Sequence, residues 1–142
     1  MPLQLPLAQQ RITKKNLGLS SHTLEKVLNY IRENLAQPLT QAEIAGMAHL
    51  SPYYFSRMFH QAMGQSLHQF IITQRVESAA QMLLTSQLTL AEIALRTGFT
   101  DQSHLYRHFK RYFGVTPKTF VEQGTNIQLE STNIQELQAD IN

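Results

Sequence analysis

The heptapeptide LTQAEIA at residues 39–45 recurs as LTLAEIA at residues 88–94, 49 positions further along the chain. Beyond one inserted residue the correspondence continues at a distance of 50, where Phe55, Arg57, Phe59, Gly64 and Phe70 match Leu105, Arg107, Phe109, Gly114 and Phe120. A period of this length is typical of a supersecondary unit that is used repeatedly. With two copies, the sequence predicts a paired module rather than a solenoid.

Each copy begins with a helix start signal. Thr40 is followed three residues later by Glu43, and Thr89 is followed in the same way by Glu92. Both pairs fit the capping box, in which the hydroxyl and the carboxylate accept hydrogen bonds from the first free amides of a helix. We therefore expect a short helix at the start of each copy.

A turn and a second helix are expected to follow. Gly98 suits the left-handed conformation that often ends a helix, and His49, at the equivalent place, tolerates positive φ better than most residues. Ser51 and Pro52 are suited to the N-cap and first turn of the next helix. A helix, a short turn and a helix make the helix-turn-helix motif, although the caps alone do not distinguish it from other helical hairpins.

The second helix of each copy should bury one face and expose another, since residues three and four apart share a helix face. The expected buried faces consist of Phe55, Phe59 and Ala62 in the first copy and of Leu105, Phe109 and Tyr112 in the second. The expected exposed faces consist of Tyr53, Ser56, Arg57 and His60 in the first copy and of Ser103, Tyr106, Arg107 and Lys110 in the second.

Two equivalent polar stripes, each centred on an arginine, indicate recognition of double-stranded DNA. Arginine can bond bidentately to guanine in the major groove, while hydroxyl groups and aromatic edges reach other base edges or phosphates. The alternative for a single helix is a solvated face with incidental arginines. The repetition of the whole arrangement favours the DNA interpretation.

Two longer stretches carry a resemblance to a known family. They are LSPYYFSRMF at residues 50–59 and GFTDQSHLYRHFK at residues 98–110, the latter continued by GVTP at residues 114–117. With these motifs in this order, residues 20–122 resemble the DNA-binding domain of the AraC/XylS family of bacterial transcription regulators. The resemblance implies an all-α fold of about seven helices, with two homeodomain-like, three-helix helix-turn-helix subdomains joined by a long central helix.

In that family the second helix of each motif enters the major groove. By resemblance, the base-side residues are Tyr53, Ser56 and Arg57 in the first motif and Gln102, Ser103, His104 and Arg107 in the second. Lys110, Arg111 and Lys118 are better suited to phosphates, because none of them belongs to the paired arginine pattern. The full set of expected phosphate contacts is Ser51, His60, Thr100, Tyr106, Lys110, Arg111 and Lys118.

The expected organisation has three parts. Residues 1–19 are predicted to be a linker or flexible arm, in which Arg11, Lys14 and Lys15 offer a weaker possibility of phosphate contact. Residues 20–122 form the DNA-binding domain, with a first subdomain at 20–64, a connecting helix at 65–86 and a second subdomain at 87–122. Residues 123–142 are predicted to be a flexible, polar, acidic tail; a short heptad of isoleucines there is the alternative. The chain has no room for the effector-binding domain that usually accompanies the family.

Helices are also predicted outside the two motifs. Pro38 should end a first helix from Ser21 to Ala36, and a closing helix should follow Thr116-Pro117 through Val121. A connecting helix of about twenty residues, 66–85, would span ~30 Å, close to the ~34 Å of one duplex turn. It could therefore place both second helices in successive grooves. For Arg75, within this helix, an ion pair with Glu43, Glu77 or Glu92 is favoured over a phosphate contact.

The composition agrees with a compact DNA-binding domain. The chain of 142 residues is 42% hydrophobic and large enough for its own core. All 12 basic and 6 of the 10 acidic residues lie in 1–120, giving +6, while the 4 acidic residues of 121–142 give −4. No apolar run approaches the ~18 residues of a membrane span. Residues 1–10 do not show the basic region and apolar core that a secretion signal would have, and the absence of cysteine fits the reducing cytoplasm.

Other chemistry is not indicated. His104 and His108 could share a helix face, but no third ligand stands at matching spacing, so no metal is expected, and no cofactor. No nucleophile elbow or glycine-rich phosphate loop supports an enzyme. We expect a monomeric domain on an asymmetric DNA site of about two turns, and the resemblance suggests activation through RNA polymerase, although no residue shows it. The rival hypotheses are a helical protein-interaction module and a sequence-indifferent architectural DNA-binding protein.

Overall fold

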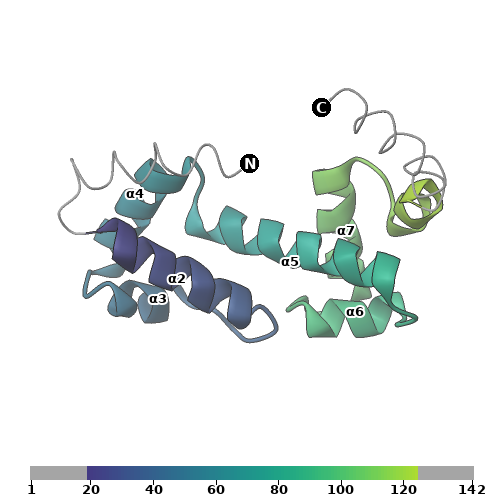
Figure 1. Cartoon of the computed structure of the whole chain (residues 1–142), viewed down its shortest axis with the longest axis horizontal. Helices are drawn as coiled ribbons and strands as arrows, with labels where there is room; N and C mark the ends of the chain where they lie inside the picture. Colours follow the sequence, from purple (N-terminus) through teal and green to yellow (C-terminus); the bar gives the residue numbers. More distant parts are fainter. Residues whose placement is uncertain (1–18, 125–142) are drawn as a thin grey trace, which may run out of the picture. The chain divides into compact units, whose positions relative to one another are not determined.

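The computed structural model describes residues 19–124, all of whose regular secondary structure is helical. The labelled helices are α2 (Ser21–Glu33), α3 (Gln41–Met47), α4 (Pro52–Met63), α5 (Leu67–Thr85), α6 (Leu90–Arg96) and α7 (Gln102–Phe113) (Figure 1). Residues 117–124 form a further helical segment. The all-α fold with two helix-turn-helix motifs is thus confirmed. Residues 1–18 of the predicted arm (1–19) and residues 125–142 of the predicted tail (123–142) lie outside the described residues.

The chain divides into two compact units between Arg75 and Val76. We call the described residues 19–75 unit 1 and residues 76–124 unit 2. The division falls within α5, so the first part of this helix belongs to unit 1 and the rest to unit 2.

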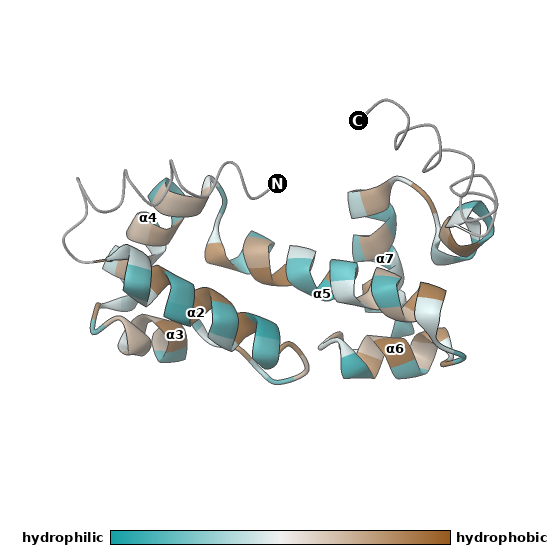
Figure 2. Ribbon diagram, viewed as in Figure 1, coloured by the Kyte–Doolittle hydropathy of each residue, from teal (hydrophilic) through white to brown (hydrophobic). Residues whose placement is uncertain are grey.

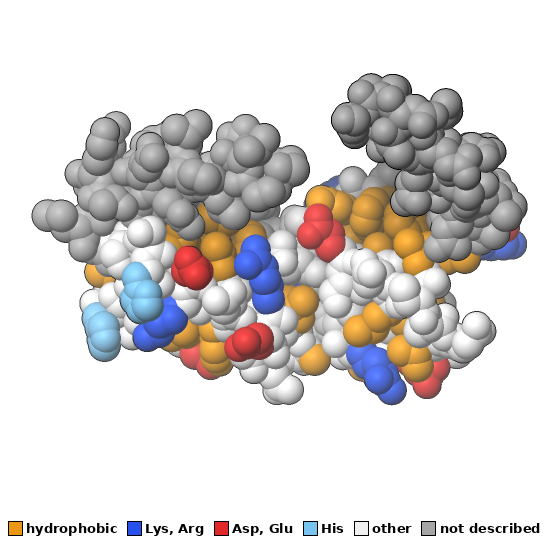
Figure 3. Space-filling view, in the orientation of Figure 1, with side chains coloured by type: hydrophobic (Ala, Val, Ile, Leu, Met, Phe, Trp, Pro, Cys, Tyr) orange, Lys and Arg blue, Asp and Glu red, His pale blue; other side chains and the backbone are white. Residues whose placement is uncertain are grey.

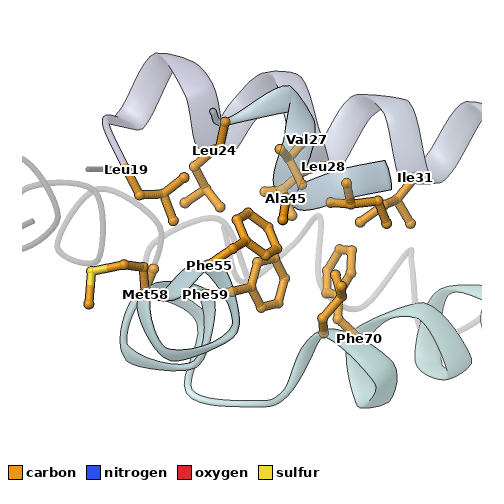
Figure 4. Close-up of a cluster of buried hydrophobic side chains, with 14 of the residues drawn as sticks. Leu19, Leu24, Val27, Leu28, Ile31, Ala45, Phe55, Met58, Phe59 and Phe70 are labelled. Carbon is orange, nitrogen blue, oxygen red and sulfur yellow. The ribbon is translucent and has the colours of Figure 1, made fainter. Parts of the chain in front are cut away.

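Unit 1 is held together by an apolar core that α2, α3, α4 and the start of α5 share. Phe55 and Phe59 are completely buried, and Figure 4 shows both rings of α4 pointing toward the aliphatic side chains of α2. The ring of Phe59 also meets Phe70 of α5 edge to face, with centroids 5.7 Å apart. The buried stripe of α2 consists of Leu24, Val27, Leu28 and Ile31, and Figure 2 shows hydrophilic and hydrophobic residues side by side along this helix.

Unit 2 has an equivalent core between α6, α7 and the end of α5. Its buried apolar residues include Ile93, Phe99, Leu105 and Phe109, together with Val76, Ala79 and Ala80 of α5. The ring of Phe109 lies 4.7 Å from Phe113 and 5.2 Å from Phe120, centroid to centroid, so the segment 117–124 packs against α7.

The two predicted capping boxes differ. In α6 the Thr89 hydroxyl accepts from the Glu92 amide and the Glu92 carboxylate accepts from the Thr89 amide, which completes the box. In α3 the Thr40 hydroxyl accepts from the Glu43 amide, but the Glu43 carboxylate accepts a hydrogen bond from the Tyr30 hydroxyl of α2. The prediction of a full box in the first copy was therefore wrong, because a tertiary donor takes the carboxylate.

Three further expectations need correction. α2 ends at Glu33, earlier than the predicted Ala36, because Asn34 leaves the helical conformation as the C-cap with φ −129°. Tyr112 was expected in the buried face of α7 but is 46% exposed. Arg75 was expected to form an ion pair; it instead donates to the backbone carbonyls of Leu35 (3.0 Å) and Gln37 (2.9 Å), which follow the end of α2.

None of the helices within residues 19–124 combines the length and the hydropathy needed to cross a lipid bilayer.

Candidate nucleic-acid interface

Both helix-turn-helix turns close in the same way. In unit 1 His49 has the predicted positive φ of 58°, and the Leu50 amide donates back to the Ala45 carbonyl at 3.1 Å. In unit 2 Gly98 has φ 91°, and the Phe99 amide donates to the Ala94 carbonyl at 2.8 Å. The duplication in sequence is thus a duplication of backbone geometry.

The inserted residue of the second copy can be placed in the turn. In unit 1 Ser51, the N-cap of α4, directly follows Leu50. In unit 2 Thr100 stands between Phe99 and Asp101, the N-cap of α7. The amide and the hydroxyl of Thr100 lie 3.3 Å and 3.0 Å from Nδ1 of His104. The longer turn is therefore secured by a side chain of the helix that follows it.

α4 presents its predicted polar stripe to solvent. Tyr53 is 70% exposed, Arg57 and His60 are exposed, and Ser56 is half-buried. An Arg57 nitrogen lies 3.4 Å from the Tyr53 hydroxyl, and the Arg57 guanidinium carbon lies 5.9 Å from the centroid of the Tyr53 ring. The aromatic ring and the cation therefore form a pair on the surface of the helix.

The start of α4 is fixed by a residue that the sequence analysis did not single out. The side-chain nitrogen of Gln41, the first residue of α3, donates to the carbonyl of Pro52 at 2.8 Å. Because Pro52 opens α4, this bond couples the two helices of the first motif directly. The corresponding residue of the second motif is Leu90, which has no side-chain donor, so the repeat itself gave no signal for this bond.

α7 presents the second stripe. Its exposed residues include the predicted base-side Gln102, Ser103 and Arg107 as well as Tyr106 and Lys110. Within residues 19–124, the side chain of Arg107 makes no hydrogen bond, ion pair or ring contact. The arginine of the second motif is thus at the same helical position as Arg57 but without its aromatic neighbour.

His104, also predicted as a base-side residue, is placed differently. Its ring lies edge-on to Phe99 with centroids 5.2 Å apart and close to the ring of His108 at 4.9 Å. With Nδ1 engaged by Thr100, the imidazole serves the turn as well as the surface. Within the described part of the chain, no group of three or more His, Asp or Glu could hold a metal ion.

The predicted phosphate contacts are all solvent-exposed. Ser51 and Thr100 flank the helix starts, Arg111 lies in the last turn of α7, and Lys118 lies in the segment 117–124. The remaining predicted contacts are His60, Tyr106 and Lys110. On the face seen in Figure 3, Lys and Arg side chains stand singly among Asp and Glu side chains, so this face has no continuous basic patch.

α7 is tied to α5 by Tyr112. The Tyr112 hydroxyl donates to a carboxylate oxygen of Glu77 at 2.6 Å. This bond, together with partial burial and the negative charge of Glu77, raises the pKa of Tyr112 to about 12. Tyr112, which was predicted to lie in the core, thus forms a hydrogen bond between α7 and α5 at the edge of unit 2.

A helix-turn-helix domain model of protein families matches residues 44–123. The chain belongs to the AraC-type helix-turn-helix family and is a DNA-binding domain of a transcription regulator, a class that does not comprise enzymes. It is 35% identical over 109 residues to the multiple antibiotic resistance protein MarA of Escherichia coli, covering 77% of this chain and 84% of MarA. It is 32% identical over 117 residues to the regulatory protein PocR of Salmonella typhimurium, covering 81% of this chain but only 39% of PocR.

Solved structures agree with this assignment. The DNA-binding domain of AdpA, crystallised in complex with a target DNA, is 32% identical with a TM-score of 0.68 over 71% of this chain and 91% of that domain. The C-terminal domain of the response regulator AraT from Geobacillus stearothermophilus is 33% identical, also with a TM-score of 0.68, over 72% of this chain and 86% of that domain. The family resemblance carried by the two sequence motifs is thereby confirmed.

Proposed function

We propose that this domain recognises a specific DNA sequence by placing α4 and α7 in major grooves. The observation that carries the proposal is the repeated exposed arginine. Arg57 and Arg107 occupy equivalent positions on two helices whose opposite faces are buried at Phe55, Phe59, Leu105 and Phe109. A guanidinium that projects from such a helix can bond to O6 and N7 of guanine.

The contacts divide into two classes in this proposal. The base-contacting residues are Tyr53, Ser56, Arg57, Gln102, Ser103, His104 and Arg107, with His104 limited to Nε2 because Nδ1 is engaged by Thr100. The phosphate-contacting residues are Ser51, His60, Thr100, Tyr106, Lys110, Arg111 and Lys118. The crystallised complex of AdpA with a target DNA supports DNA as the ligand of this fold.

The spacing of the two helices is part of the proposal. α5 has 19 residues, which correspond to roughly 28 Å of helix at ~1.5 Å per residue. One turn of duplex is ~34 Å long. We propose that the second subdomain (87–122) follows the first (20–64) along the DNA, so that a monomer covers an asymmetric site of about two turns.

Activation of transcription in the cytoplasm through RNA polymerase is the regulatory role that the family resemblance implies. We propose this role on that basis alone, since none of the described contacts identifies a polymerase surface.

Arginine and lysine substitutions on one helix test the proposal. A binding site is first selected from a pool of random duplexes, and the affinity for this site and for random DNA is then measured. Arg107→Ala should lose ~1–3 kcal/mol on the selected site and relax the preference at one base pair. Lys110→Ala, one turn away, should weaken binding to all sequences alike and lower the dependence on salt.

The same measurements separate the rival functions. A protein-interaction module would show no salt-dependent affinity for duplex DNA. An architectural protein would bind selected and random duplexes equally well, and Arg107→Ala would then weaken both to the same extent.

A further inference from the structure

The two helices proposed to enter the major grooves, α4 and α7 (the recognition helices), differ in the surroundings of their arginines. In α4 the aromatic ring of Tyr53 stands one helical turn before Arg57, with 3.4 Å between the Arg57 nitrogen and the Tyr53 hydroxyl and 5.9 Å between the guanidinium carbon and the ring centroid. In α7 the residue equivalent to Tyr53 is Ser103, and the side chain of Arg107 has no such partner within residues 19–124.

This difference affects how each arginine meets a base. A bidentate bond to guanine fixes the whole arginine side chain, which otherwise samples many rotamers on the surface. A ring placed beside the guanidinium restricts these rotamers before the DNA arrives, and the planar cation is attracted to the aromatic ring. Preorganisation of this kind improves binding by reducing the entropy that is lost in the complex.

We infer that Tyr53, which the proposed function counts among the base-contacting residues, acts there as a positioning residue for Arg57 and not through a separate base contact of its own. The first recognition helix then contacts a base pair through an arginine that Tyr53 has already oriented. The second recognition helix contacts a different base pair through Arg107 alone. The inference rests on the proposed function. It adds that one side chain determines how well another discriminates between bases, and that the duplicated motifs are unequal in this respect.

A simple structural role for Tyr53 does not account for the arrangement. Tyr53 is 70% exposed, and its hydroxyl makes no hydrogen bond within residues 19–124 other than the one with Arg57. Replacing it should therefore leave the core of unit 1 intact, so that DNA binding can be compared among folded variants with thermal melting as the control.

A double-mutant cycle tests the inference. The affinities of Tyr53→Ala, Arg57→Ala and the double variant are measured on the selected site and on sites in which each base pair is changed in turn. We expect Tyr53→Ala to lose about 2–5-fold and to flatten the preference at the same base pair as Arg57→Ala. The double variant should bind no more weakly than Arg57→Ala, and Tyr53→Phe, which keeps the ring, should retain most of the discrimination.

The second motif supplies the matched control. Ser103→Ala and Arg107→Ala should give nearly additive losses, since no hydrogen bond or ring contact joins the two side chains. In the free protein, the NMR order parameter of the Arg57 Nε–H bond should exceed that of Arg107 and fall to the same level in Tyr53→Ala.

Two results would overturn the inference separately from the proposed function. If the wild-type domain discriminates between sequences but Tyr53→Ala and Arg57→Ala lose affinity additively at different base pairs, Tyr53 contacts the DNA independently. If the order parameter of Arg57 is unchanged by Tyr53→Ala, the ring does not restrain the guanidinium. A wild-type domain that binds random and selected duplexes equally would overturn the proposed function and the inference with it.

Discussion

Tyr112 shows how a single hydroxyl can link stability to pH. Its phenol is protonated when it donates to Glu77, and its pKa of about 12 in the folded protein lies above the ordinary value of about 10. The folded state therefore retains the proton more strongly than the unfolded chain does. The stabilisation is complete below pH ~10 and is lost as the pH rises toward ~12.

Removing this hydroxyl should make that linkage visible. We expect Tyr112→Phe to lower the free energy of unfolding by about 1 kcal/mol or less at neutral pH, since the bond lies near the surface. The difference between wild type and variant should shrink between pH ~10 and ~12. Chemical denaturation across this range measures it. Tyr106→Phe is the control, because the Tyr106 hydroxyl makes no hydrogen bond within residues 19–124. An equal loss of unfolding free energy in Tyr106→Phe would refute the role of the hydrogen bond between Tyr112 and Glu77.

At the same scale, the sequence repeat predicted which residues are exposed, but it did not predict which of these residues interact. Arg57 and Arg107 could be predicted because helical spacing decides which positions face solvent. The bond between Thr100 and His104 could not, because it depends on where the inserted residue enters the turn. The prediction that Tyr112 is buried was wrong because helical spacing alone does not show that an acceptor, Glu77, lies at the edge of the core.

At the scale of the element, the segment that follows α2 depends on α5. Backbone carbonyls outside regular secondary structure need hydrogen-bond donors from elsewhere. Arg75 of α5 donates to the carbonyls of Leu35 and Gln37 just beyond α2, and its partial burial lowers its pKa from the ordinary value. The guanidinium thus holds the segment that leads from α2 to α3.

Arg75→Met should expose this role. The substitution keeps a long side chain but removes the donors, so we expect a loss of about 1–3 kcal/mol in the free energy of unfolding. Arg107→Met is the matched control on an exposed helix position and should change stability by no more than about 0.5 kcal/mol. Urea denaturation of both variants measures the two losses. Equal losses would mean that the hydrogen bonds from Arg75 to the Leu35 and Gln37 carbonyls contribute nothing specific to stability.

The helices themselves were largely predictable from local chemistry. Ser51 and Pro52 start α4 as expected, and Thr89 with Glu92 starts α6. One of the errors at this scale has a tertiary cause and the other a local one. Tyr30 takes the Glu43 carboxylate away from its expected partner, and Asn34 ends α2 early by donating to the Tyr30 carbonyl. Neither residue pair stands out in the sequence, because helical spacing does not show which side chain will reach the Glu43 carboxylate or the Tyr30 carbonyl.

At the scale of the whole molecule, the proposed two-groove contact makes a prediction about the DNA. Inserting five base pairs between the two determinants of the selected site turns them to opposite faces of the duplex, since a turn contains about 10.5 base pairs. We expect affinity to fall to that of a site with one determinant. Electrophoretic mobility shifts on both duplexes measure this, and unchanged affinity would show that the two motifs bind without a fixed spacing.

α5 has a consequence for folding that concerns both units. Its residues Leu67, Phe70 and Ile71 complete the core of unit 1, while Val76, Ala79 and Ala80 are buried in unit 2. If either unit melts, half of this helix loses its packing, and a short helix without tertiary support is marginal in water. The domain should therefore denature as one cooperative system, and damage to either core should lower a single shared melting temperature.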